Sequence, residues 1–124
     1  MGRQYAIDSK TVLLPDEIDL TRQIDGIHYV LFEGRFLAGD DKGRNIWAFD
    51  ANGKFLWKIQ PLPLSDETVI EYWISIYQDK SGRIAVMNCD DNIVHVDPKT
   101  GDLYRTDGVK IPRVRTMAEW KNPP

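Results

Sequence analysis

A repeated segment is the feature of this sequence that most restricts the fold. NIWAFDANGKFLW (residues 45–57) and NIVHVDPKTGDLY (residues 92–104) each place two strand-like runs on either side of a turn. Together with the residues that precede them, GRFLAGDDKGR and GRIAVMNCDD, they form a unit that recurs after about 48 residues, a period typical of propeller-type repeats. The chain is therefore predicted to repeat one β-structured unit.

The repeated unit has the residue pattern of a β-hairpin. Side chains alternate between the two faces of a strand, so Trp47 and Phe49 share one face while Ile46 and Ala48 share the other. In the turn at 50–53, Asn and Gly can adopt positive φ, and Asp can accept hydrogen bonds from the backbone ahead. The second unit has DPKTG, in which Pro presets φ and Gly closes the loop. Both units are predicted to be hairpins within a four-stranded meander.

These patterns predict an all-β fold. We expect two antiparallel meander repeats, at about residues 27–61 and 74–112, in a single domain of residues 1–124. Three arrangements remain open: two small sheets packed as a sandwich, an incomplete barrel or propeller, and a ring assembled from several chains. We favour the sandwich, because it buries both apolar faces inside one chain.

The N-terminal residues are expected to extend this framework. YAID (5–8) and TVLLP (11–15) have the composition of edge strands. PDEIDLTRQI (15–24) is expected to form one helical turn or a loop.

The strand ending in Asp50, the glycine turn and the aromatic strand GKFLW (53–57) resemble a blade of the pyrroloquinoline-quinone-type β-propellers. The resemblance spans about residues 27–112 and implies blade-like sheets. It transfers no cofactor residue, because the quinone and metal ligands of the catalytic members come from a closed ring of blades. Two blades cannot close such a ring, since propellers typically have four to eight.

The charge balance argues against several classes of function. The chain has 19 acidic and 16 basic residues, a net charge of −3, and no basic stripe of the kind that binds phosphate backbones. Direct nucleic-acid binding is therefore not expected. No apolar run approaches the roughly 20 residues of a membrane-spanning helix, and the N-terminus lacks a secretory signal pattern. With a single cysteine, which fits a reducing compartment, we expect a cytoplasmic protein without membrane association.

Residues suited to catalysis or metal binding are few. Cys89 and His95 could face one another across a hairpin as nucleophile and base, which makes a small hydrolase one alternative. No orienting third group or nucleophile signature accompanies them, so a buried cysteine and a strand histidine are the plainer interpretation. The acidic pairs at 40–41 and 90–91 lack calcium-loop spacing, and no phosphate-binding glycine loop occurs. We therefore expect no enzyme activity, no cofactor and no bound metal.

A short, acid-leaning chain with this hairpin and a second, degenerate blade also resembles the immunity proteins of bacterial polymorphic toxin systems. The residues that carry this resemblance are Asn45, Ile46, Phe49, Asp50, Gly53, Leu56 and Trp57. Such proteins bind a toxin domain and block its active site, so the resemblance implies a non-enzymatic protein-binding function. A scaffold or oligomerising propeller-like module is the main alternative.

Acids and aromatics around the predicted strands are the candidate contact residues for a toxin domain. The segment after the PLPLS break (61–65) joins carboxylates, which speed encounter with a basic partner, to rings that supply desolvated contact area. The competing interpretation begins the next strand at Tyr72 and Trp73, which would then alternate between core and solvent. The candidate residues are Asp66, Glu67, Glu71, Tyr72 and Trp73, with the loop pairs Asp40, Asp41, Asp90 and Asp91.

Overall fold

The computed structural model of the chain describes residues 2–35, 37, 41–62 and 72–112, and the regular structure of these residues is β. The prediction of an all-β fold is confirmed. The strands are β1 (Gln4–Ile7), β2 (Lys10–Leu13), β3 (Ile18–Ile24), β4 (Ile27–Phe32), β5 (Ile46–Phe49), β6 (Phe55–Lys58), β7 (Trp73–Gln78), β8 (Ile84–Asn88), β9 (Ile93–Val96) and β10 (Leu103–Tyr104).

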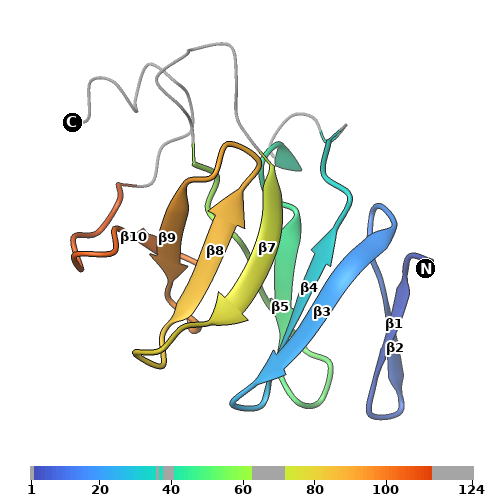
Figure 1. Cartoon of the computed structure of the whole chain (residues 1–124). Coiled ribbons are helices and arrows are strands. Elements are labelled where there is room, and N and C mark those ends of the chain that lie inside the picture. The colour runs from blue at the N-terminus through green and yellow to red at the C-terminus, as the bar shows by residue number, and fades with distance from the viewer. Residues whose placement is uncertain (1, 36, 38–40, 63–71, 113–124) are drawn as a thin grey trace.

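The strands form three antiparallel sheets (Figure 1). β1 and β2 pair as a hairpin, β3-β4-β5-β6 form the first four-stranded sheet, and β7-β8-β9-β10 form the second. Both four-stranded sheets are simple meanders, and neither closes into a barrel. This arrangement agrees with the favoured prediction of a small β-sandwich.

One apolar core lies between the two four-stranded sheets. Alternation along each strand directs every second side chain to this core. Residues from both sheets meet there: Tyr29, Leu31, Ile46, Ala48 and Trp57 from the first, and Trp73, Ile76, Ile84, Val86, Val94, Val96 and Leu103 from the second. Trp57 also donates a hydrogen bond from its indole nitrogen to the Pro98 carbonyl, 2.9 Å away, and so ties the first sheet to a loop of the second.

Two buried amide side chains fasten the sheets to one another. Asn45 donates to the carbonyls of Phe32 and Trp73, at 2.9 and 2.8 Å, and accepts from the Trp73 backbone N–H at 2.8 Å. Gln60 accepts from the Leu103 backbone N–H at 3.0 Å and donates to the Ile111 carbonyl at 3.3 Å. A buried polar group is costly unless it is hydrogen-bonded, so each amide favours the one placement of the two sheets that satisfies its hydrogen bonds.

The opposite face of the first sheet is covered by the β1–β2 hairpin. The hairpin contributes Ile7, Val12 and Leu14 to a second apolar cluster, and the first sheet contributes Ile18, Val30, Phe32 and Phe49. The Tyr5 hydroxyl lies 2.9 Å from Nδ1 of the buried His28. The N-terminal strands were expected at a sheet edge, and they form a separate layer instead, because their apolar residues cover aromatic side chains of the first sheet.

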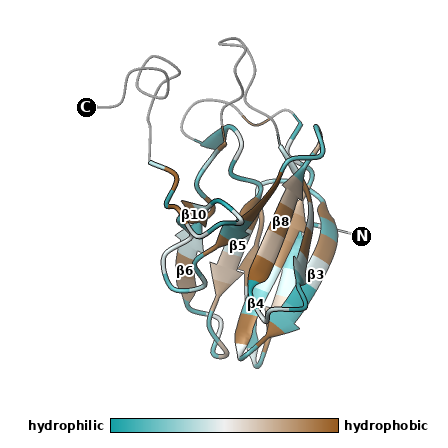
Figure 2. Cartoon of the chain, turned by 60° about the vertical axis from the view of Figure 1, so that its left-hand side comes forward, coloured by the Kyte–Doolittle hydropathy of each residue, from teal (hydrophilic) through white to brown (hydrophobic). Residues whose placement is uncertain are grey.

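The segment at 15–24 differs from its prediction. It was expected to be a helical turn or a loop, and it contains β3, the first strand of the first sheet. Its pairing with β4 shifts between Ile18 and Leu20, which breaks the strict alternation expected of a strand. Figure 2 shows the resulting mixture of polar and apolar residues along β3. The first sheet consequently begins before residue 27, where the first repeat was predicted to begin.

The two repeats also align differently from the expected register. Gly34 was matched with Gly82, but Gly82 ends the β7–β8 turn, whose counterpart in the first sheet is the β3–β4 turn at Asp25-Gly26. Gly34 instead follows β4, at a point where a Cβ atom would lie 2.4 Å from the Asn45 Cβ. The loop between β4 and β5 is longer than the loop between β8 and β9, and this insertion displaces the alignment.

Candidate functional site

The predicted contact residues divide into those the structure describes and those it does not. Asp40, Asp66, Glu67 and Glu71 lie outside the described residues. Asp41 lies at the end of the β4–β5 loop, where its carboxylate is 2.9 Å from the Lys58 ammonium. Both partners are about one-third exposed, and a pair of this kind contributes little to stability.

The prediction that Trp73 is an exposed contact residue is wrong. Its side chain is 1% exposed, because Trp73 is the first residue of β7 and points into the core. Its backbone N–H and carbonyl are both held by Asn45. Tyr72 is half-buried, with the Arg35 guanidinium 6.0 Å from the centre of its ring. The competing interpretation, in which these residues begin a strand, is confirmed for Trp73.

Asp91 occupies a position that glycine holds in two other turns. In the turns that begin at Asp50, Asp79 and Asn88, the first side chain accepts hydrogen bonds from the backbone N–H groups two and four residues ahead. The fourth residue has positive φ in each turn: +84° at Gly53, +86° at Gly82 and +62° at Asp91. Carrying a side chain in this conformation costs roughly 1 kcal/mol relative to glycine. Asp90 and Asp91 thus form an exposed acidic pair at a turn where glycine would be more stable.

No described strand packs on the outer face of the second sheet (Figure 1). The strand registers place on this face the side chains that alternate with the core residues. We call it the open face; its larger residues are Ile74, Tyr77, Met87, Ile93, His95 and Tyr104. Ile74 and Ile93 are 41% and 45% exposed. Asp90 and Asp91, which directly precede β9, lie at its rim.

Cys89 and His95 are not brought together. His95 pairs with Ala85 across β8 and β9, while Cys89 lies beyond the last residue of β8. Four residues of strand separate those positions, a distance of roughly 13 Å at 3.3 Å per residue. The His95 Nε2 atom lies instead 2.7 Å from an Asp79 carboxylate oxygen. The register therefore removes the geometry on which the hydrolase alternative depends.

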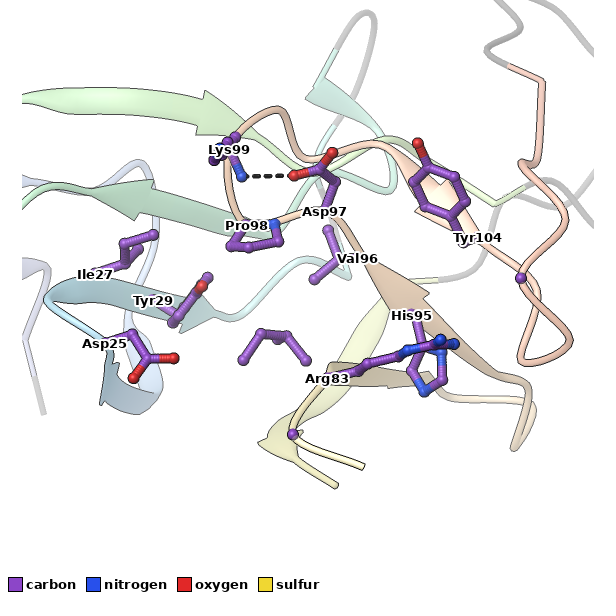
Figure 3. A pocket seen from close by; sticks show the side chains of 13 residues that line it. Asp25, Ile27, Tyr29, Arg83, His95, Val96, Asp97, Pro98, Lys99 and Tyr104 are labelled. Atoms are coloured by element: carbon purple, nitrogen blue, oxygen red, sulfur yellow. Dashed lines mark hydrogen bonds between the residues drawn. The ribbon is translucent and has the colours of Figure 1, made fainter. Parts of the chain in front are cut away.

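A cleft of about 540 Å³ lies at the end of the sandwich where β3, β7 and β9 end and β4, β8 and β10 begin (Figure 3). We call it the end cleft. The β3–β4 turn, the β7–β8 turn and the β9–β10 loop surround it. Its lining residues are Asp25, Ile27, Tyr29, Gly82, Arg83, Ile84, His95, Val96, Asp97, Pro98, Lys99, Tyr104 and Gly108. The described Asp41, Tyr72, Asp90 and Asp91 belong to the opposite end of the meanders.

Tyr29 is the most buried polar residue of the end cleft. Its side chain is 1% exposed, and Figure 3 shows it between Asp25 and Val96. Burial, together with the negative charges of Asp25 and Asp97, raises the pKa of the Tyr29 hydroxyl to about 12. The phenol is therefore neutral at pH 7 and lies in a negative field. Asp97 is held in place by the Lys99 backbone N–H, which donates to its carboxylate at 2.8 Å.

Residues 1–108 match the model of a protein family described as a domain of unknown function, DUF7957. The chain belongs to this family. No curated protein and no solved structure matches the chain. The matched residues contain both four-stranded sheets, the open face and every lining residue of the end cleft, so these features all belong to the DUF7957 domain.

The described residues lack two further features. No group of three or more His, Cys, Asp or Glu side chains in this part of the DUF7957 chain is arranged to hold a metal ion. Among the same residues, none forms a helix with the length and apolar character needed to cross a membrane.

Sequence reasoning did not identify the end cleft. Its polar residues come from three separate turns, and each of them, taken alone, is an ordinary turn or strand residue. One signal was present: Asp25-Gly26 and Asp97-Pro98 both follow strands that run toward the same end of a meander. The missed strand β3 concealed this signal, because without it Asp25 has no defined place.

Proposed function

We propose that this chain is a non-enzymatic binding protein that neutralises a toxin domain by covering part of the surface of that domain. The open face carries the proposal. It is a sheet face with exposed Ile74 and Ile93 at the end that adjoins the β8–β9 turn, and the acidic pair lies in that turn. The corresponding face of the first sheet is covered by the chain's own hairpin, which supports the view that the second face is suited to a partner.

The composition of the open face suggests the chemistry of that partner. Isoleucine and tyrosine side chains supply apolar contact area, while the carboxylates of Asp90 and Asp91 would orient a basic surface and speed its approach. The partner we propose has an apolar patch with a basic border. Toxin domains that attack nucleic acid have basic clefts, and an acidic inhibitor with a net charge of −3 suits them.

A protein partner fits the open face better than a second copy of the chain does. Every copy carries the same net charge and the same acidic pair, so self-association brings like charges together. The position of Asp91 adds to this argument, because an acid occupies a position where glycine would be more stable. The encounter that we propose takes place in the cytoplasm of the producing cell.

The test uses the toxin domain encoded beside this gene and measures its affinity by calorimetry and growth rescue by co-expression. Ile93→Glu and Ile74→Glu place a charge on the open face and should weaken binding by at least about 2 kcal/mol, roughly 30-fold. Leu13→Glu is the matched control, because Leu13 is 69% exposed on the hairpin, away from the open face. All three variants should retain the circular dichroism spectrum of the parent.

Three outcomes would contradict the proposal. Equal affinity of all variants would show that the toxin domain binds elsewhere, and the absence of any binding would remove the immunity function. A homodimer seen by analytical ultracentrifugation and dissociated by Ile93→Glu would assign the open face to self-association. That result would favour the oligomerising alternative.

A further inference from the structure

The end cleft has the features of a second binding site, which shares only His95 and Tyr104 with the open face. It has an apolar floor of Ile27, Ile84, Val96 and Pro98. Such side chains favour an aliphatic group over a fully hydrated one. The cleft is bounded by both four-stranded sheets, so it exists only when the two sheets are assembled.

Figure 3 shows the two carboxylates of the cleft on either side of Tyr29, with Asp25 below it and Asp97 above it. The Tyr29 residue is 1% exposed and lines the cleft, and among the described residues none forms a hydrogen bond with its hydroxyl. This hydroxyl is therefore available to a ligand in the cleft. Asp25 and Asp97 lie close enough for their charges to act on it. Within the part of the chain that the structure describes, neither carboxylate forms an ion pair.

We propose that the end cleft binds an ammonium or guanidinium group carried on an aliphatic stem. The cation would lie between the carboxylates of Asp25 and Asp97, with the Tyr29 hydroxyl accepting a hydrogen bond, and the stem would lie on the apolar floor. Charge-assisted hydrogen bonds of this kind are stronger than neutral ones, and the partial enclosure of the cleft reduces screening by solvent.

The basic residues of the cleft do not oppose this assignment. Figure 3 shows Arg83 extending toward His95, away from Asp25 and Tyr29. Neither Arg83 nor Lys99 is among the charges that act on the Tyr29 hydroxyl, whereas both carboxylates are. The field at the enclosed side of the cleft is therefore negative, and an anionic ligand would be disfavoured there.

Two sources could supply such a cation: a lysine or arginine side chain of a protein partner, or a free alkyl amine. The first test uses free probes and needs no toxin. 1,5-Diaminopentane and methylguanidine are titrated into the labelled protein at pH 7, and backbone amide shifts are followed by NMR. Pentanol and pentanoate, which have the stem without the cation, are the matched probes.

We expect saturable shifts at residues 25–29 and 97–99 with the two cations, and none with pentanol or pentanoate. Asp25→Asn and Tyr29→Phe should each weaken cation binding at least about tenfold, since each removes a charge-assisted contact. Asp97→Asn retains the turn and should act similarly. Asp90→Asn, at the other end of the sheets, is the control and should bind the cations like the parent. Equal shifts with the uncharged probe, a preference for pentanoate, or unchanged affinity in Asp25→Asn would overturn the proposal.

A second measurement separates the two sources. If a partner side chain is the natural ligand, Asp25→Asn weakens toxin binding and diaminopentane competes with the toxin domain. If a free amine is the ligand, toxin affinity stays unchanged while the NMR response is lost. The probe titration needs no toxin, so a failure of the proposed immunity function would not affect the proposed cation site. A failure of the cation site would likewise not affect the proposed immunity function.

Discussion

The two four-stranded sheets share one architecture but differ in what lies on their outer faces. Both are antiparallel meanders that contribute to the same core. The first sheet places Val30, Phe32 and Phe49 beneath the β1–β2 hairpin, which buries them in a second cluster. The second sheet has Ile74 and Ile93 in the corresponding region, with no described strand over them. One repeat therefore uses both faces for stability, and the other uses one.

The proposed binding function rests on this difference. A four-stranded sheet with one buried face has a stable fold already, so its second face is free to vary. Covering that face adds apolar burial, at about 25 cal/mol for each Å² removed from water. Leaving it open keeps an apolar surface available to a partner. The first sheet has a covered outer face and the second an open one, so the effects of matched substitutions on the two outer faces can be compared within one chain.

The joint between the sheets should be the most sensitive point of the molecule. Asn45→Ala removes three hydrogen bonds and leaves the backbone groups of Trp73 unpaired in the core. We expect the free energy of unfolding to fall by about 3 to 5 kcal/mol, because each buried unsatisfied group costs 1 to 3 kcal/mol. Urea denaturation followed by tryptophan fluorescence measures the change.

The control for this variant is Asn52→Ala, at an exposed turn position, which should change the free energy of unfolding by less than about 0.5 kcal/mol. A similar small loss at Asn45 would show that packing alone joins the sheets. The two four-stranded sheets would then be independent units held together by apolar contact only.

The contrast between the outer faces can be tested at matched isoleucines. Ile7→Ala, in the covered cluster, should lower the free energy of unfolding by about 2 to 4 kcal/mol through lost burial and the cavity that remains. Ile93→Ala, on the open face, should lower it by less than about 1 kcal/mol, since this residue is 45% exposed already. Equal losses at the two positions would mean that the open face is covered, and this would remove the main support for a partner surface.

The sequence predicted the elements that depend on local residue chemistry. The turn at 50–53 was identified because Asp50 can accept hydrogen bonds from the backbone ahead and Gly53 can take positive φ, and both features are present. The turn at 97–101 was identified because Pro98 presets φ and Gly101 closes the loop, and Gly101 has positive φ. The alternation of Ile46 and Ala48 against Trp47 and Phe49 was also correct, since the two pairs lie in different clusters. Period-two patterns of this kind require no knowledge of distant contacts.

The errors occurred where distant contacts decide the structure. β3 was missed because Thr21, Arg22 and Gln23 interrupt the apolar alternation of its sequence, and its place in the sheet comes from pairing with β4. Trp73 was ambiguous because its acidic neighbours suggest exposure, whereas its burial depends on Asn45, 28 residues earlier in the chain. The end cleft required the pairing of three turns from two sheets, which no local pattern contains. Candidate sites composed of one contiguous segment were therefore favoured over the site that the fold assembles.

The smallest effect that we predict distinguishes two turns of similar hydrogen-bond pattern, one from each four-stranded sheet. Asp50 and Asp79 each begin a four-residue turn and accept backbone hydrogen bonds in the same pattern. The Ser81 hydroxyl, 2.6 Å away, is the main reason that the pKa of Asp79 falls to about 2, and the His95 ring adds to it. Backbone N–H groups, that of Lys54 first, lower the pKa of Asp50 as well, without a hydroxyl to assist.

These pKa values predict an acid-dependent loss of stability that is larger for the second sheet. A carboxyl with a depressed pKa in the folded state stabilises the fold above the unfolded value, near 3.9, and loses that effect as the pH falls toward 2. Urea midpoints measured between pH 6 and pH 2 should therefore decline less steeply below pH 4 in Asp79→Asn than in the parent. Asp50→Asn should flatten the same slope to a smaller extent. In Ser81→Ala the decline should lie at higher pH than in the parent, because the pKa of Asp79 is no longer lowered by the Ser81 hydroxyl. An effect of Asp50→Asn that equals or exceeds that of Asp79→Asn would contradict this prediction, because the side-chain partners of Asp79 would then add nothing to its backbone hydrogen bonds.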